Sequence, residues 1–322
     1  MDPESAVYIG IYMHTCYKIQ NVSNILTKTP NAMCVLLYMF LGLLSVVMVC
    51  GNLLVMISII YFKQLQTPTN YLVLSLAVAD LLVGTLVFPS SMVFSFSSCM
   101  SYKNVFCKVR NSLDMILCTS SLMNLCCISI DRYHAVCVPL TYRTKINHHV
   151  VVVMILVSWT VAVIVGLAFS LSEQGTCVEN CISAFVIANA VGTVVSFYLP
   201  VIIMLCIYLK IFLVAQKQVR SIHNMSKCGA AVSKMERKAT KTLAIVMGVF
   251  LFCWLPFFFC ITFVSSIISV PMSVLETLNW LVLMNSLLNP FIYAFFYSWF
   301  RSAFRMIISG KIFQGDFTNS KL

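Results

Sequence analysis

The chain has 322 residues, of which 60% are hydrophobic and only 10% are charged. A soluble globular domain carries about 25% charged residues, so this composition and the mean hydropathy of +0.94 exclude a soluble protein and indicate a membrane protein. The net charge of +11 would also suit nucleic-acid binding, but the basic residues lie mainly beside the apolar segments and therefore indicate a membrane topology signal.

Seven apolar segments are long enough to cross a bilayer, which takes about 20 residues in a helix. Five runs contain no Asp, Glu, Lys or Arg, namely 32–62, 150–171, 182–209, 242–275 and 277–300. Two further apolar stretches, about 69–97 and 105–138, carry the isolated acids Asp80 and Asp114. We therefore expect an all-α membrane protein, a bundle of seven transmembrane helices at about 34–62, 69–97, 105–138, 149–171, 184–213, 236–265 and 274–297.

The segments that flank the bundle indicate its orientation. Sixteen Lys and Arg residues lie on the side that carries Arg132 and the C-terminus, against five on the other side, Arg110 among them. The positive-inside rule therefore places residues 1–33 outside the cell as a tail and residues 298–322 inside it. Asn21 begins a glycosylation sequon in the outer tail. Apolar and basic residues alternate at helical spacing over 299–309, which predicts an amphipathic helix on the inner membrane surface.

Asp114 is the only charged side chain between Arg110 and Asp131. A carboxylate at the bilayer centre costs about 2.5–3.5 kcal/mol on insertion scales, so an intramembrane acid predicts a functional site by default. At 1.5 Å per residue, Asp114 lies about 10 Å below Cys107 and about 27 Å from Arg132, in the outer third of the bundle. The alternative is a structural carboxylate that neighbouring helices satisfy.

Several side chains are candidates for the walls of a cation site at this level. Trp254, Phe257 and Phe258 share one helix face, and aromatic rings attract a cation by about 0.5–2 kcal/mol each. Plain core packing explains these rings equally well. Cys118 lies one turn below Asp114, and polar groups on the fifth helix come from Thr193 and Ser196. These two hydroxyls either face the site or bond their own backbone.

A recognisable motif falls on every expected helix. In chain order these are Gly51-Asn52, Leu76-Ala77-Val78-Ala79-Asp80, Asp131-Arg132-Tyr133, Trp159, Pro200 with Tyr208, Cys253-Trp254-Leu255-Pro256 and Asn289-Pro290-Phe291-Ile292-Tyr293. Over about residues 34–310 the chain resembles the rhodopsin-like G-protein-coupled receptors. Residues 285–300, NSLLNPFIYAFFYSWF, fill every fixed position of the pattern N-S-x-x-N-P-x-x-Y-x-x-x-Y-x-W-F. That pattern is similar to the signature of the trace amine-associated receptors.

The resemblance implies a receptor in the plasma membrane that binds a small protonated amine at Asp114. It also implies activation of a stimulatory or olfactory heterotrimeric G protein, cAMP production and a role in olfaction. No nucleophile–base pair, metal cluster or phosphate loop is evident, so we expect no enzyme activity and no cofactor. The alternatives are a neurotransmitter-type monoamine receptor and, outside the receptors, an amine or ion transporter.

The resemblance also implies roles for individual residues. The implied disulfides are Cys107–Cys181 and Cys16–Cys177. An ionic latch would join the Asp131–Arg132 pair to Glu236 and open on activation. The other residues of the implied activation switch are Tyr133, Tyr208, Trp254, Asn289, Pro290 and Tyr293. A polar set at mid-membrane depth would suit a sodium ion or a water network and comprises Asn52, Asp80, Ser121, Asn285 and Asn289.

The seventh helix departs from the amine-receptor pattern. Such receptors usually carry a Tyr seven positions before Pro290, and here that position is Leu283. Trp280 lies one turn further out, and Glu276 about 11 Å above Leu283. A second carboxylate above Asp114 suits a diamine or polyamine. However, Ser273 and Glu276 also form a capping box, which by itself explains the acid at that position.

Overall fold

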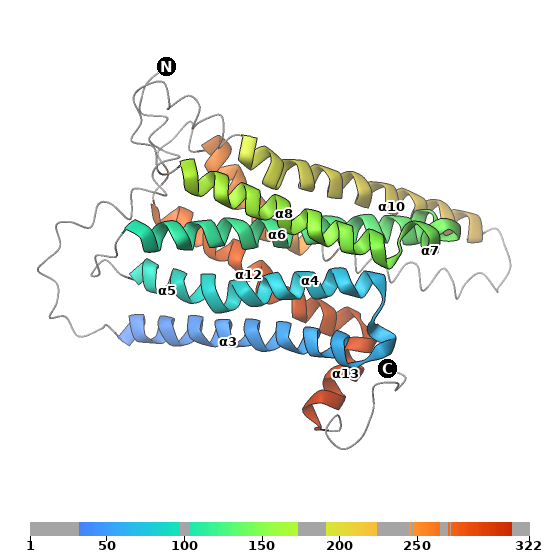
Figure 1. Cartoon of the computed structure of the whole chain (residues 1–322), viewed down its shortest axis with the longest axis horizontal. Helices are drawn as coiled ribbons and strands as arrows, with labels where there is room; N and C mark the ends of the chain where they lie inside the picture. The colour runs from blue at the N-terminus through green and yellow to red at the C-terminus, as the bar shows by residue number, and fades with distance from the viewer. Residues whose placement is uncertain are drawn as a thin grey trace, which may run out of the picture.

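The computed structural model describes residues 32–96, 104–172, 191–223, 245, 248–264, 270 and 272–310. Six helices in this part of the chain are long and apolar enough to span a membrane, and a shorter apolar helix runs over Gly248–Val264. In Figure 1 the long helices run side by side as one bundle. The expected all-α, seven-helix architecture is therefore confirmed, and the chain is a multi-pass membrane protein.

The first two spans are joined by a short turn. Helix α3 covers Ala32–Tyr61, the 3-10 turn η1 covers Lys63–Leu65, and α4 begins at Pro68. Thr67 caps α4 by accepting a hydrogen bond from the backbone N–H of Asn70, which satisfies one of the N–H groups left open at a helix start. Helix α4 (Pro68–Leu82) continues through the π-helical segment η2 (Val83–Val87) into α5 (Phe88–Phe96).

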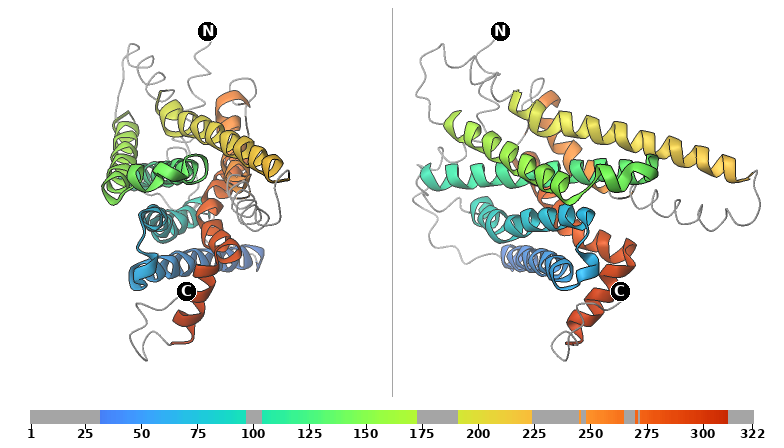
Figure 2. Two further views of the ribbon diagram at one scale, coloured as in Figure 1. Left: turned by 90° about the vertical axis from the view of Figure 1, so that its right-hand side faces the viewer. Right: turned by 45° about the vertical axis from the view of Figure 1, so that its right-hand side comes forward.

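The third and fourth spans follow. Helix α6 covers Asn104–Cys137 and α8 covers His148–Ser172; between them lie η3 (Pro139–Thr141) and α7 (Tyr142–Lys145). Helix α6 packs against α4, α8 and α10, and it lies between its neighbours in the views of Figure 2. This central position explains why α6 carries so many buried polar residues, because its side chains face other helices rather than lipid.

The fifth helix continues beyond the predicted transmembrane span. It contains the π-helical segment η4 (Val194–Tyr198) and α10, which runs over Leu199–His223 and extends beyond its neighbours in Figure 1. The predicted span ends at 213 and the apolar part of the helix ends at Val214, because hydropathy locates only the part in lipid. Residues 214–223 include good helix formers such as Ala, Gln, Lys and Arg and no Gly or Pro, so the helix continues into water.

The last span leads directly into a surface helix. Helix α12 covers Met272–Phe296 and α13 covers Ser298–Ile308. Arg301 Nη1 donates to the carbonyl oxygens of Ala294 at 3.1 Å and Phe295 at 3.0 Å, which satisfies acceptors left open at the end of α12. Ala303 of α13 is buried with Phe62 and Leu65, so the apolar face of α13 covers the turn after the first span.

Gly166 of α8 allows α8 to approach α6 closely. A Cβ added at Gly166 would lie 2.3 Å from Ile116 Cγ1 and 3.1 Å from the carbonyl oxygen of Ser112, whereas one added at Gly42 of α3 would meet nothing within 4 Å.

Gly166→Ala should therefore force α6 and α8 apart and destabilise the fold by about 1–3 kcal/mol, the usual cost of overpacking. We expect the unfolding temperature of the purified protein in detergent to fall by at least about 2 °C. Gly42→Ala is the matched control and should leave it unchanged or raise it slightly, because Ala favours a helix more than Gly does. Equal unfolding temperatures for both variants would contradict the close packing of α6 on α8.

Candidate functional site

Asp114 lies partly buried on α6, and within the described part of the chain the hydrogen bond to its carboxylate comes from a thiol. Cys118 Sγ donates to Asp114 Oδ1 at 3.3 Å from one turn deeper in the same helix. A thiol is a weak donor, so this contact compensates little of the cost of keeping a carboxylate ionised in an apolar bundle.

Leu283 and the predicted site residue Trp280, both on α12, lie in an apolar cluster. Leu283 on α12 is 1% exposed and belongs to a buried cluster with Leu117 of α6 and Phe88 of α5. Trp280, one turn further out, packs its ring edge-on against Phe88 with centroids 5.0 Å apart. The position where amine receptors usually carry a tyrosine is therefore part of the packed core.

The predicted aromatic residues lie together, but mainly as a stack. Phe258 stacks on Phe197 of η4 with ring centroids 3.7 Å apart and planes 7° from parallel. Trp254 is nearly parallel to Phe258 at 5.9 Å, and Phe257 meets Phe258 edge-on at 5.4 Å. Sequence reasoning missed Phe197, because spacing along one helix cannot identify a ring supplied by another.

Two hydroxyl residues of the fifth span lie at the π-helical segment η4. Ser196 is buried within it, and Thr193 lies just before it. Tyr198, also in η4, donates from its hydroxyl to Thr262 Oγ1 at 2.8 Å. Together with the stack of Phe197 on Phe258, this bond joins the fifth span to the helix Gly248–Val264.

Arg110 is buried, which the sequence analysis did not predict when it counted this residue among the cations of the outer side. Its side chain is 7% exposed and its Nη2 donates to Ser91 Oγ on α5 at 2.9 Å. An arginine near a helix end can extend to water, so its position alone did not reveal burial. The signal that could have found it is its spacing of four residues from Asp114, which places both on one helix face.

Asp80 is the centre of a polar network in the middle of the bundle. Ser121 Oγ donates to Asp80 Oδ1 at 3.1 Å and Asn289 Nδ2 donates to Asp80 Oδ2 at 2.7 Å. Asn52 Nδ2 donates to the carbonyl oxygen of Ser286 at 3.2 Å. Asn285, which precedes Ser286 on α12, is also buried. Residues far apart in the chain are thereby linked across α3, α4, α6 and α12.

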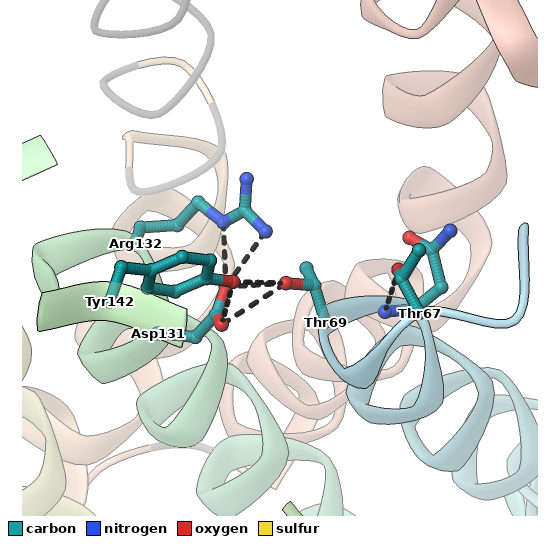
Figure 3. Close-up of polar contacts among 6 residues, drawn as sticks. Thr67, Thr69, Asp131, Arg132 and Tyr142 are labelled. Atoms are coloured by element: carbon teal, nitrogen blue, oxygen red, sulfur yellow. Dashed lines mark hydrogen bonds and ion pairs between the residues drawn. The ribbon is translucent and has the colours of Figure 1, made fainter. Parts of the chain in front are cut away.

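The Asp131–Arg132 pair lies at the expected cytoplasmic end of α6 (Figure 3). Arg132 Nη2 lies 2.7 Å from Asp131 Oδ2. The fully buried carboxylate also accepts hydrogen bonds from the Tyr142 hydroxyl at 2.8 Å and from Thr69 Oγ1 at 3.0 and 3.1 Å. Burial raises the pKa of the Tyr142 phenol above its usual value, and the charge of Asp131 also raises it, so the phenol remains a donor.

The sequence analysis did not predict Thr69 and Tyr142 as partners of Asp131. Thr69 lies at the start of the second span and Tyr142 in the turn after the third, so spacing along α6 does not identify them. Tyr133 meets the ring of His134 edge-on at 5.6 Å and lies under Lys210 Nζ at 5.9 Å, so it faces α10.

A cavity of about 850 Å³ opens beside this pair. Arg132, Tyr208 and Tyr293 line it, as do Asn289 and Tyr297. The Tyr208 hydroxyl accepts a hydrogen bond from Ser129 Oγ at 3.1 Å. Pro290 contacts the first span at Gly51, where an added Cβ would lie 2.9 Å from Pro290 Cβ. Four of the nine predicted switch residues, Arg132, Tyr208, Asn289 and Tyr293, thus line one cavity.

Some predicted residues lie outside the described part of the chain. These are Cys16, Asn21, Cys177, Cys181 and Glu236, so both disulfides, the glycosylation sequon and the third member of the latch stay predictions. Cys107 and Glu276 are placed only as positions along α6 and α12.

Comparisons with known proteins agree with this architecture. A family model described as "7 transmembrane receptor (rhodopsin family)" matches residues 51–293. Trace amine-associated receptor 1 of Homo sapiens is 43% identical over 96% of this chain and 98% of its own length. The same receptor of Macaca mulatta is also 43% identical, over 96% of this chain and 98% of its own length. Trace amine-associated receptor 4 of Mus musculus is 39% identical over 95% and 94%.

Thr69→Val should destabilise the protein, because it removes a donor from the buried carboxylate of Asp131 while it keeps the side chain's shape. An unsatisfied buried polar group costs about 1–3 kcal/mol, and we expect a lower unfolding temperature in detergent. Thr85→Val is the control, since Thr85 is exposed and bonds only its own helix through the carbonyl oxygens of Leu81 and Leu82. A loss no greater than that of the control would show that Thr69 does not support Asp131.

Proposed function

The chain belongs to the rhodopsin family of seven-transmembrane receptors and, within it, to the trace amine-associated receptors, and on this basis we propose that it is a plasma-membrane receptor for protonated amines. Its N-terminus lies outside the cell, and it activates a heterotrimeric G protein of the stimulatory or olfactory type. The family consists of receptors, so the chain is not an enzyme.

The observation that carries this proposal is the incomplete compensation of Asp114. Its carboxylate is partly buried and receives a bond from the weak thiol donor Cys118, whereas Asp80 and Asp131 receive bonds from amide, hydroxyl and guanidinium groups. A ligand ammonium would form a charge-assisted hydrogen bond with Asp114 and offset its desolvation. The weak hydrogen bonding of Asp114 therefore leaves its carboxylate able to bind an external ammonium.

The signal passes from the ligand site to the cavity beside Arg132 through packed elements. The ring stack of Phe197, Phe258 and Trp254 joins the fifth span to the sixth, and the Asp80 network joins α6 to α12. A ligand that prefers one arrangement of these helices shifts the population toward it. The G protein then binds where Arg132, Tyr208 and Tyr293 line the cavity.

We propose that the Asp80 network holds a sodium ion or ordered water. Asp80 and Ser121 supply carboxylate and hydroxyl oxygens, which are the donors that hard cations take. Asn52 Oδ1 is buried and has no hydrogen-bond partner among the described residues, so it offers a further acceptor.

Among amines, diamines and polyamines are the proposed favoured class, with an olfactory role. Glu276 supports this because it lies on α12, about two turns above Leu283, where a second ammonium would reach a second acid. A neurotransmitter-type monoamine receptor would need no such second anchor. An amine or ion transporter is the alternative of another class, and amine-driven signalling without uptake of radiolabelled amine would exclude it.

Asp114→Asn should abolish activation by amines, because it keeps the shape of the side chain but removes the charge that binds the ammonium. Loss of one partner of a buried charge pair costs about 2–5 kcal/mol, so potency in a cell-based cAMP assay should fall by at least about thirtyfold. Cys118→Ser is the control, since it keeps a donor to Asp114 and should respond. Unchanged amine potency in Asp114→Asn at normal surface expression would refute the amine site.

Glu276→Gln tests the diamine preference separately. If Glu276 binds a second ammonium, the variant should lose about tenfold or more in potency for 1,5-diaminopentane and little for pentylamine, which lacks the second charge. Equal losses for the two amines would assign Glu276 to helix capping alone.

A further inference from the structure

Arg110 is a buried cation in the wall of the proposed amine site. It lies on α6 one helical turn outside Asp114, about 6 Å along the helix axis, on the same face. Burying a guanidinium is costly, and an arginine this close to the end of a span would usually extend to water. Here Arg110 is instead held against α5, because its Nη2 donates to Ser91 Oγ at 2.9 Å.

The two charged groups have opposite signs and lie one turn apart. Asp114 is bonded to Cys118 on its deeper side, and Arg110 is bonded to Ser91 on α5. A plain amine at Asp114 adds a second cation beside Arg110, and like charges at this distance repel each other. A carboxylate on the same ligand reverses that interaction, because the guanidinium presents a fork of N–H donors that matches two carboxylate oxygens.

We infer that the site is built for an amino acid, whose ammonium pairs with Asp114 and whose carboxylate pairs with Arg110. This inference rests on the proposed amine site and adds a second anchor of opposite charge to it. Leu117, about one turn deeper than Asp114 on α6, belongs to the apolar cluster with Leu283 and Phe88, so the deeper side of the charged pair is apolar.

The anchor on α6 is independent of the one proposed at Glu276, because Glu276 belongs to α12. A basic amino acid carries two ammonium groups and one carboxylate and could use all three positions. Arg110 and Glu276 are therefore tested with different variants and different pairs of ligands.

The test compares ligands that differ only by one carboxylate: L-phenylalanine with phenethylamine, and L-lysine with 1,5-diaminopentane. Cells expressing the full chain should respond to the amino acid of each pair at a concentration at least about tenfold lower than to the amine. In Arg110→Gln the potency of the amino acids should fall at least about tenfold, while that of the amines holds or rises.

Two further variants distinguish loss of the carboxylate anchor from a folding defect. Arg110→Lys keeps the charge and should retain a preference for the amino acids. Ser91→Ala should weaken that preference because it removes a hydrogen bond that holds the guanidinium toward α5. The comparison in the wild type needs no variant, so poor surface expression of Arg110→Gln leaves it intact.

The inference is overturned if the wild type responds only to the amines, or if Arg110→Gln shifts both members of each pair equally; the amine site would survive either result. Failure of the proposed function would give a different experimental result. In that case Asp114→Asn has no effect on any of the four ligands in cells that display the receptor at the surface.

Discussion

Charged side chains inside an apolar bundle must find their partners within the protein, and the arrangement of this molecule follows from that constraint. In the hydrocarbon core there is no water to solvate them. Asp80 is satisfied by Ser121 and Asn289, and Asp131 by Arg132 with Thr69 and Tyr142. Apart from the neighbouring Asp131–Arg132 pair, these contacts join residues from different elements, so they fix how α4, α6 and α12 stand relative to one another.

Helix α6 is central because it carries several of these groups at different depths. Arg110 and Asp114 lie toward its N-terminal end, Ser121 in the middle and the Asp131–Arg132 pair near its C-terminal end. One helix therefore contacts the proposed ligand site, the polar network and the cavity beside Arg132. The close approach of α8 at Gly166 and the packing of α4 and α10 hold it in place.

The acids differ in how well the protein compensates them, and this difference separates structural roles from the proposed binding role. Asp131 accepts hydrogen bonds from hydroxyl groups and a guanidinium, and Asp80 from a hydroxyl and an amide. Asp114 receives the bond of a thiol. A strongly compensated carboxylate gains little from another cation, whereas a weakly compensated one gains much. The neighbouring charge of Arg110 then selects among the cations that can enter.

The sequence by itself determined the membrane class, the seven apolar helices and the amphipathic α13, because hydropathy and helical spacing are local properties. It also identified Asp80, Asp114 and Asp131, since a carboxylate in an apolar segment is conspicuous. Only the tertiary structure showed that Arg110 is buried against Ser91, that Phe197 completes the ring stack, and that Thr69 and Tyr142 bind Asp131. Each of these contacts joins different helices, and hydropathy carries no information about which faces meet.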